Sequence, residues 1–226
     1  NNVGNTTSHT ITGLTAGNTY YFWVKAVGDG SDSDYTNRLT VLLIPGAPSN
    51  QAITPNSSTQ VTLSWTGGNG ASSYNYWFGT SATYTSNTKT NGETSTSVVK
   101  TGLTQNTQYY LRVESVNATG IVTAGTTVNN YTNASVVTNV SVASTSASSL
   151  TVSYTKPAGD QNGGTVVLLY SETANGTYST GVNDGATAST SLVQTGLDAN
   201  QQYYFQIRNY SGNGSYANHA SYDNAY

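Results

Sequence analysis

Residues 97–113 read SVVKTGLTQNTQYYLRV, and this segment is the most informative part of the chain about its fold. The same pattern occurs as SHTITGLTAGNTYYFWV at residues 8–24 and as SLVQTGLDANQQYYFQI at residues 191–207. In each copy a Gly-Leu pair is followed, six residues after the leucine, by Tyr-Tyr, and the three leucines lie 89 and 94 residues apart. A repeat of this length indicates a chain built from several domains of one kind.

The pattern inside each copy is that of a β-strand. Leu111 and Val113 alternate with Arg112 and Glu114, and this period of two is typical of a strand with one buried face. Asn-Gly pairs between such runs suit the positive-φ positions of tight turns. No segment has the periodicity of a helix. The sequence therefore predicts an all-β protein.

The composition excludes several classes of protein. Ser, Thr, Asn and Gly make up half of the 226 residues, and only 8% are charged. Aromatic residues reach 11% and fall in alternating patterns, which distinguishes the chain from a disordered one. A net charge of −3 with seven scattered basic residues argues against a nucleic-acid partner. The longest apolar run, Val166–Tyr170, is far shorter than the roughly 20 residues that span a bilayer.

The chain has no cysteine, so disulfides, thiolate metal sites and cysteine nucleophiles are excluded together. The low content of Lys and Glu is more typical of an extracellular surface than of a cytosolic one. We therefore expect an extracellular or cell-surface location.

The spacing of the leucine and the tyrosine resembles the fibronectin type III domain, a seven-strand β-sandwich. There this spacing marks the turn between strands E and F, so the resemblance implies that Tyr20, Tyr109 and Tyr203 form the tyrosine corner of each copy. It also identifies residues 61–65 as strand B with its buried Trp, and residues 150–154 as the strand B in which Tyr replaces that Trp.

The resemblance divides the chain into tandem fibronectin type III sandwiches, the first only partly present. Residues 1–45 are expected to supply only strands E to G of a domain, followed by full domains at residues 46–135 and 136–226. The partial domain is expected to leave an apolar face open, formed by Ile11, Leu14, Tyr20, Phe22 and Val24. Two explanations remain open: the segment is an excerpt of a longer repeat chain, or a neighbouring subunit supplies the missing strands.

The sequence contains no catalytic motif. The two histidines, His9 and His219, lie in no arrangement that supplies a nucleophile and its base, so we expect neither an enzyme nor a cofactor. One metal site is a candidate: Asp29, Asp32 and Asp34 lie within six residues in an expected F–G loop and offer oxygen ligands for Ca²⁺. The alternative is a solvated polar loop.

Outward-facing aromatic residues are the other candidate site. Tyr20 is expected to face inward, and successive residues of a strand face opposite sides, so Tyr21 and Trp23 are expected on the outer face of their strand. The same counting places Trp77, Tyr110 and Arg112 together on the outer face of strands C and F. Such a face suits a sugar ring or another subunit. The alternative is ordinary cross-strand pairing, with the guanidinium of Arg112 over the Trp77 ring.

These observations favour a non-catalytic structural segment of an extracellular repeat protein, such as a fibre, an appendage or an adhesin stalk. It would assemble through contacts between sandwiches, with neighbouring repeats or further copies of the same protein as partners. A spacer module of a secreted polysaccharide-degrading enzyme is the alternative, and a carbohydrate-binding module a third possibility. The prolines of the linker at residues 44–48 predict limited bending, whereas the proline-free junction at residues 132–137 is expected to bend more.

Overall fold

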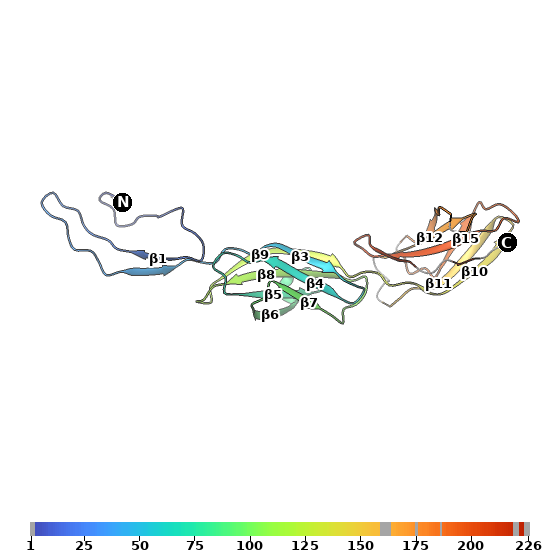
Figure 1. The fold of residues 1–226 in the computed structure, drawn as a ribbon, viewed down its shortest axis with the longest axis horizontal. Coiled ribbons are helices and arrows are strands. Elements are labelled where there is room, and N and C mark those ends of the chain that lie inside the picture. The colour runs from blue at the N-terminus through green and yellow to red at the C-terminus, as the bar shows by residue number, and fades with distance from the viewer. Residues whose placement is uncertain (1–2, 159–163, 175, 186, 219–221, 224–226) are drawn as a thin grey trace.

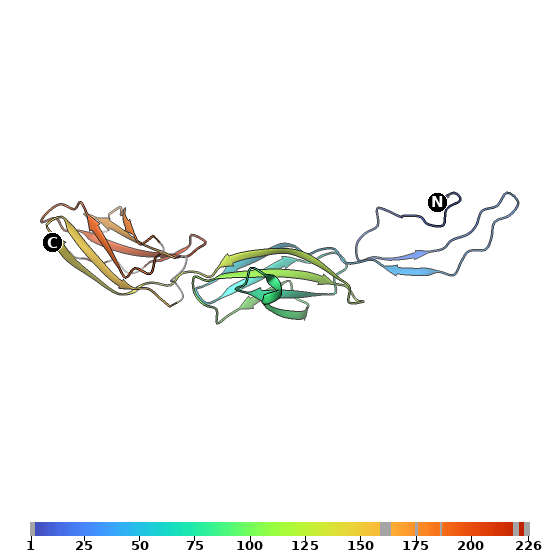
Figure 2. The ribbon, with the colours of Figure 1, turned by 180° about the vertical axis from the view of Figure 1, so that it is seen from behind.

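The computed structural model describes residues 3–158, 164–174, 176–185, 187–218 and 222–223. Three β-rich units follow one another along a single long axis, so the chain is a rod with the first unit at one end and the third at the other (Figures 1 and 2). No helix in the described part of the chain is long and apolar enough to cross a membrane.

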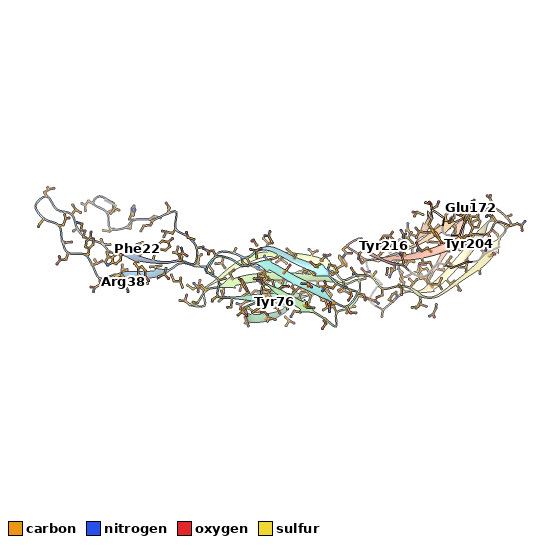
Figure 3. The ribbon with its side chains drawn as sticks, viewed as in Figure 1. Phe22, Arg38, Tyr76, Glu172, Tyr204 and Tyr216 are labelled. Carbon is orange, nitrogen blue, oxygen red and sulfur yellow. The ribbon has the colours of Figure 1, made fainter. Side chains whose placement is uncertain are left out.

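The first unit is a two-stranded hairpin. Strands β1 (Thr19–Phe22) and β2 (Leu39–Leu42) pair antiparallel, with Tyr20 opposite Val41. Beyond β1 the hairpin continues irregularly through two hydrogen bonds between Val24 and Thr36, one of them accepted by the Thr36 hydroxyl. Figure 3 shows the side chains of this hairpin without a second sheet over them.

One expectation about the first unit is wrong: residues 8–12 form no strand, although the sequence predicted strand E there. In the second and third units strand E pairs with strand B, as residues 97–100 pair with 61–64 and residues 191–195 with 149–153. Residues 3–45 contain no strand B for residues 8–12 to pair with. The same absence leaves the apolar face open, as expected: Ile11 is 45% and Val24 60% exposed.

The second unit is a sandwich of two antiparallel sheets. One sheet has the order β3-β4-β7 and the other β6-β5-β8-β9. The strands are β3 (Ser49–Pro55), β4 (Val61–Thr66), β5 (Ser73–Gly79), β6 (Thr88–Glu93), β7 (Ser97–Lys100), β8 (Gln108–Val116) and β9 (Val122–Tyr131), with a short 3₁₀ turn, η1 (Tyr84–Ser86), between β5 and β6.

The core of the second unit lies between these sheets. Leu111 and Val113 of β8 are fully buried, as the alternation predicted. Trp65 of β4 packs edge-on against Tyr74 at 5.6 Å and tilted against Tyr76 at 5.8 Å between ring centroids. Figure 3 labels Tyr76 within the middle unit.

The third unit repeats this arrangement. Its sheets have the orders β10-β11-β14 and β13-β12-β15-β16, with β17 also paired to β15. The strands are β10 (Thr138–Ser146), β11 (Ser149–Thr155), β12 (Thr165–Ser171), β13 (Ser179–Asn183), β14 (Ser191–Thr195), β15 (Tyr204–Tyr210), β16 (Tyr216–Asn218) and β17 (Tyr222–Asp223). Tyr154 occupies the place that Trp65 has in the second unit.

Candidate functional site

Each motif tyrosine accepts a hydrogen bond from a backbone N–H five residues earlier in the chain. The N–H of Thr104 donates to the Tyr109 hydroxyl at 3.0 Å, and Asp198 donates to Tyr203 at 2.9 Å. The first unit has the equivalent bond, 2.8 Å long, to Tyr20. These bonds hold the E–F loops, which join β7 to β8 and β14 to β15, in one shape.

The corresponding loop of the first unit, residues 14–18 before β1, is called its E–F loop and lies at the junction between the first and second units. The carbonyl of Ala16 accepts a hydrogen bond from the Asn69 side chain at 2.7 Å, and the N–H of Gly17 donates to the carbonyl of Ile44 at 2.9 Å. Gly17 also lies against Gly70 of the B–C loop, which joins β4 to β5. A Cβ atom on Gly17 would lie 2.2 Å from the Gly70 Cα atom, so this backbone contact requires glycine.

The E–F loop of the second unit contacts the third unit and also Asn133, near the end of the second unit. The Gln105 side chain donates to the carbonyl of Ala158 in the next B–C loop, and the N–H of Asn106 donates to the carbonyl of Asn133 at 3.1 Å. The Asn106 side-chain oxygen accepts a bond from the N–H of Gly212 at 2.9 Å. The Ser215 hydroxyl bonds Asn133 at 3.1 Å. Side chains therefore bridge the junction that lacks proline.

The outer aromatic face of the second unit differs from the expected pairing. Arg112 is opposite Trp77 across β5 and β8, but its guanidinium lies over the ring of Tyr84, 3.9 Å from the centroid. The cation over Trp77 is instead Lys89, at 4.5 Å. Trp77 and Tyr84 meet edge to face at 5.2 Å. The alternative of cross-strand pairing thus holds with other partners than Arg112 over Trp77, because η1 inserts a tyrosine that the strand pattern does not contain.

Tyr110 lies two residues along β8 from Arg112 and is opposite Gly79 rather than Trp77. Its hydroxyl donates to the side-chain oxygen of Gln108 at 2.9 Å. The rings of this face are therefore held by neighbours from their own sheet and from η1.

The first hairpin carries a more open aromatic face. Tyr21 is 49% and Trp23 52% exposed, and the guanidinium of Arg38 lies 4.8 Å from the Tyr21 centroid. Trp23 lines an open depression together with Tyr35 and Thr36. Tyr35 is missing from the sequence-predicted site, because it lies in an irregular part of the hairpin where alternation gives no signal.

The candidate calcium loop does not form a metal site. Asp32 pairs with Lys25, and no three acidic or imidazole side chains in the described residues gather in a way that could hold a metal ion. The structure therefore does not bring Asp29, Asp32 and Asp34 together. His9 is exposed, and His219 lies outside the described residues.

A buried ion pair in the third unit has no counterpart in the sequence prediction. The side chains of Lys156 and Asp184 are 2% and 0% exposed, and Lys156 also donates to the carbonyl of Thr187. Asp184 accepts further bonds from the Tyr154 hydroxyl at 3.2 Å and the Val166 N–H at 3.0 Å. Burial and the negative charge of Asp184 raise the pKa of Tyr154 well above its ordinary value.

The geometry defines a class of protein: tandem antiparallel β-sandwiches whose E–F loops carry a tyrosine corner and contact the next unit. Residues 135–222 match the fibronectin type III domain family. A two-domain fibronectin type III segment of chicken tenascin has a similar fold, with a TM-score of 0.51 and 18% identity, over 78% of this chain and 99% of that one. The chain therefore has the fold of tandem fibronectin type III β-sandwiches, and its third unit matches the family.

Two relatives are similar in sequence. Chitinase A1 of Niallia circulans is 32% identical over 149 residues, which are 60% of this chain and 20% of the relative. Exoglucanase B of Cellulomonas fimi is 30% identical over 225 residues, which are 90% of this chain and 20% of the relative. The chain thus spans about a fifth of the length of these relatives.

Proposed function

We propose that this chain is a non-catalytic spacer segment of an extracellular repeat protein, in which domains at residues 1–45, 46–135 and 136–226 are stacked end to end. The observation that supports this most is the repeated junction. Equivalent positions of the E–F loop, Ala16 and Gln105, contact equivalent positions of the next B–C loop, Asn69 and Ala158. A contact of this kind at both junctions holds successive domains at set separations, which is what a stalk or spacer needs.

Small-angle X-ray scattering of the whole chain tests this proposal. A stiff rod gives one extended distance distribution, whereas independently moving domains give a broad one. The test variant is Asn106→Gly, which removes the oxygen that accepts the bond from the Gly212 N–H, while glycine tolerates the positive φ of that position. The control is Asn200→Gly, the same change at the equivalent residue of the third unit, which is exposed. We expect Asn106→Gly to broaden the distribution and Asn200→Gly to leave it unchanged. A broad distribution in the unaltered chain would contradict the proposal.

The relatives favour one setting for such a spacer, a secreted enzyme that degrades polysaccharide. The names chitinase and exoglucanase support an accessory role beside a catalytic domain. In that setting the open face of Tyr21, Trp23 and Tyr35 is the part of the chain best suited to contact carbohydrate, since flat exposed rings stack on sugars.

Binding to insoluble chitin and cellulose tests the carbohydrate contact. Trp23→Ala is expected to abolish retention, while Trp77→Ala, a change at a ring held by Lys89 and Tyr84, is expected to leave it intact. No retention of the unaltered chain would contradict carbohydrate contact and leave the spacer proposal standing. Ordered filaments in electron micrographs of the chain would instead favour a fibre subunit that assembles with its own copies.

A further inference from the structure

Three Asn-Gly pairs lie wholly within the described residues: Asn69–Gly70, Asn91–Gly92 and Asn213–Gly214. Asn162 and Asn175, which begin two more pairs, lie outside the described residues. An Asn-Gly pair is chemically labile, because glycine has no side chain to hinder attack of its backbone nitrogen on the side-chain carbonyl carbon of the asparagine before it. The two groups must rotate into contact, so the surrounding structure decides which pair reacts.

The Asn91–Gly92 pair is the least restrained of the three. Both residues are exposed and lie in β6, an edge strand, where a shift of register places them together opposite Asn75 as a bulge. The Asn91 side chain makes no hydrogen bond to any residue that the structure describes. The Gly92 N–H, which is the attacking group, donates to the Asn75 side-chain oxygen at a long 3.3 Å. Local opening of such an edge costs little, so these groups can meet.

The Asn213–Gly214 pair is held at both reacting groups. The side-chain oxygen of Asn213 accepts bonds from the Ser215 N–H at 3.0 Å, from the Ser215 hydroxyl at 2.8 Å and from the Ser211 hydroxyl. Its amide nitrogen donates to the carbonyl of Tyr131 at 3.3 Å. The N–H of Gly214 donates to the Ser211 carbonyl at 2.9 Å. These bonds must break before the Gly214 nitrogen can reach the Asn213 side chain.

The Asn69–Gly70 pair is held by packing as well as by hydrogen bonds. The Asn69 amide donates to the carbonyl of Ala16 at 2.7 Å, and the backbone carbonyl of Asn69 accepts a bond from the Gly46 N–H at 2.9 Å. Gly70 lies so close to Gly17 that a Cβ atom on Gly70 would be 2.2 Å from the Gly17 Cα atom. Ring closure requires the peptide unit between Asn69 and Gly70 to rotate, and this contact opposes the rotation.

We propose that Asn91 is a site of spontaneous deamidation in the folded protein, while Asn69 and Asn213 are protected from the same reaction. The Gly92 nitrogen forms a bond to Cγ of Asn91, the bond from Cγ to the side-chain nitrogen breaks, and that nitrogen leaves as ammonia with the proton of the Gly92 N–H. An imide ring remains. Water then adds across one of the two C–N bonds of the imide and leaves either aspartate or isoaspartate at this position.

This selectivity keeps the reaction away from the domain junctions. Asn69 and Asn213 each donate an amide N–H to a carbonyl of the neighbouring unit, and a carboxylate at either position would have no proton to donate. A carboxylate at Asn91 breaks no side-chain hydrogen bond of that residue. It adds a negative charge to an edge strand, where charge opposes pairing with another chain. The chain therefore acquires its chemical damage at a sheet edge while the junctions keep their amides.

Peptide mapping of the whole chain after incubation in mildly alkaline buffer tests the proposal, with aspartate and isoaspartate measured at each Asn-Gly pair. We expect Asn91 to convert about tenfold or more faster than Asn69 and Asn213, because each hydrogen bond that must break slows ring closure. In guanidinium chloride the three pairs should convert at similar rates, since unfolding removes the protection. Conversion of Asn69 or Asn213 as fast as Asn91 in the folded chain would overturn the proposal.

Two variants make the test specific. Ser215→Ala removes a hydroxyl bond to Asn213 and leaves the surroundings of Asn91 intact, so it should speed conversion at Asn213 severalfold and leave the rate at Asn91 unchanged. An unchanged rate at Asn213 would refute its protection by these bonds. Asn91→Gln should stop fast conversion at that position, because glutamine would have to close a larger ring, while the melting temperature stays the same. Fast conversion there would show a route other than the imide and overturn the proposal.

Discussion

Lys156→Met is expected to destabilise the third domain strongly. The substitution removes the cation from a pair whose side chains are 2% and 0% exposed, and leaves the Asp184 carboxylate buried without a counter-charge. Removing one partner of a buried ion pair costs about 3–5 kcal/mol. A domain of this size has a total free energy of unfolding of about 5–15 kcal/mol, so the loss is a large fraction of it.

Urea unfolding measured by two signals tests this expectation. All three tryptophans, Trp23, Trp65 and Trp77, lie outside the third domain, so their fluorescence reports only on the first two units. Hydrogen exchange read by mass spectrometry follows the third domain separately. We expect its urea midpoint to fall by about 2 M or more, while the tryptophan transition stays in place. An unchanged midpoint of the third domain would show that the domain tolerates Asp184 without the charge of Lys156, contrary to this expectation.

A double variant distinguishes loss of the charge pair from loss of packing. Asp184→Asn keeps a side-chain oxygen for the Val166 N–H but removes the negative charge. Combined with Lys156→Met, it leaves no unpaired charge in the interior. We expect the double variant to recover more than half of the stability lost in Lys156→Met. If the double variant is as unstable as the single one, packing rather than charge accounts for the effect.

Three further predictions follow from the same geometry. Burial raises the pKa of Tyr154 in the folded protein above its unfolded value of 10.0, so the stability that the protonated hydroxyl contributes is complete below that value and is lost as pH rises above it. The difference between the melting temperatures at pH 9 and pH 11 should therefore be smaller for Tyr154→Phe than for the unaltered chain. Gly212→Val should loosen the second junction, since even a Cβ would lie 2.5 Å from ring carbons of Tyr131, and scattering should detect the change. Leu111→Ala, at a side chain with no exposed surface, should cost the second domain about 2–5 kcal/mol in urea unfolding followed by Trp65 fluorescence.

The sequence predicts the folds of the second and third units well, because their signals are local. Strand alternation at residues 109–113 and 203–207 places buried and outward residues correctly. Strand E of the first unit was predicted from the same motif and is absent. A strand needs a partner, and pairing between strands B and E is a long-range property that no window of sequence contains.

The candidate sites show the same division between local and long-range information. The alternation of inward and outward residues places Trp77 on the outer face of its strand. The residues that contact its ring, Tyr84 and Lys89, come from a turn and from the next strand, where this alternation gives no information. Lys156 and Asp184 lie 28 residues apart and share no pattern. Tyr154 stands where the resemblance leads one to expect Trp, and it is the sequence signal that points to this pair. Its hydroxyl is buried and needs a polar partner, which is Asp184.

Asparagine has a structural role at the domain junctions. Asn106 adopts a left-handed backbone, donates its N–H to Asn133 and accepts a bond from Gly212 with its side chain. Lysine or glutamate would bring a charge that needs a partner, whereas an amide both donates and accepts without one. Contacts made by neutral amides are not screened by salt, in contrast to ion pairs. We therefore expect a rod built on such junctions to keep its domain spacing across changes of ionic strength, as the proposed spacer function requires.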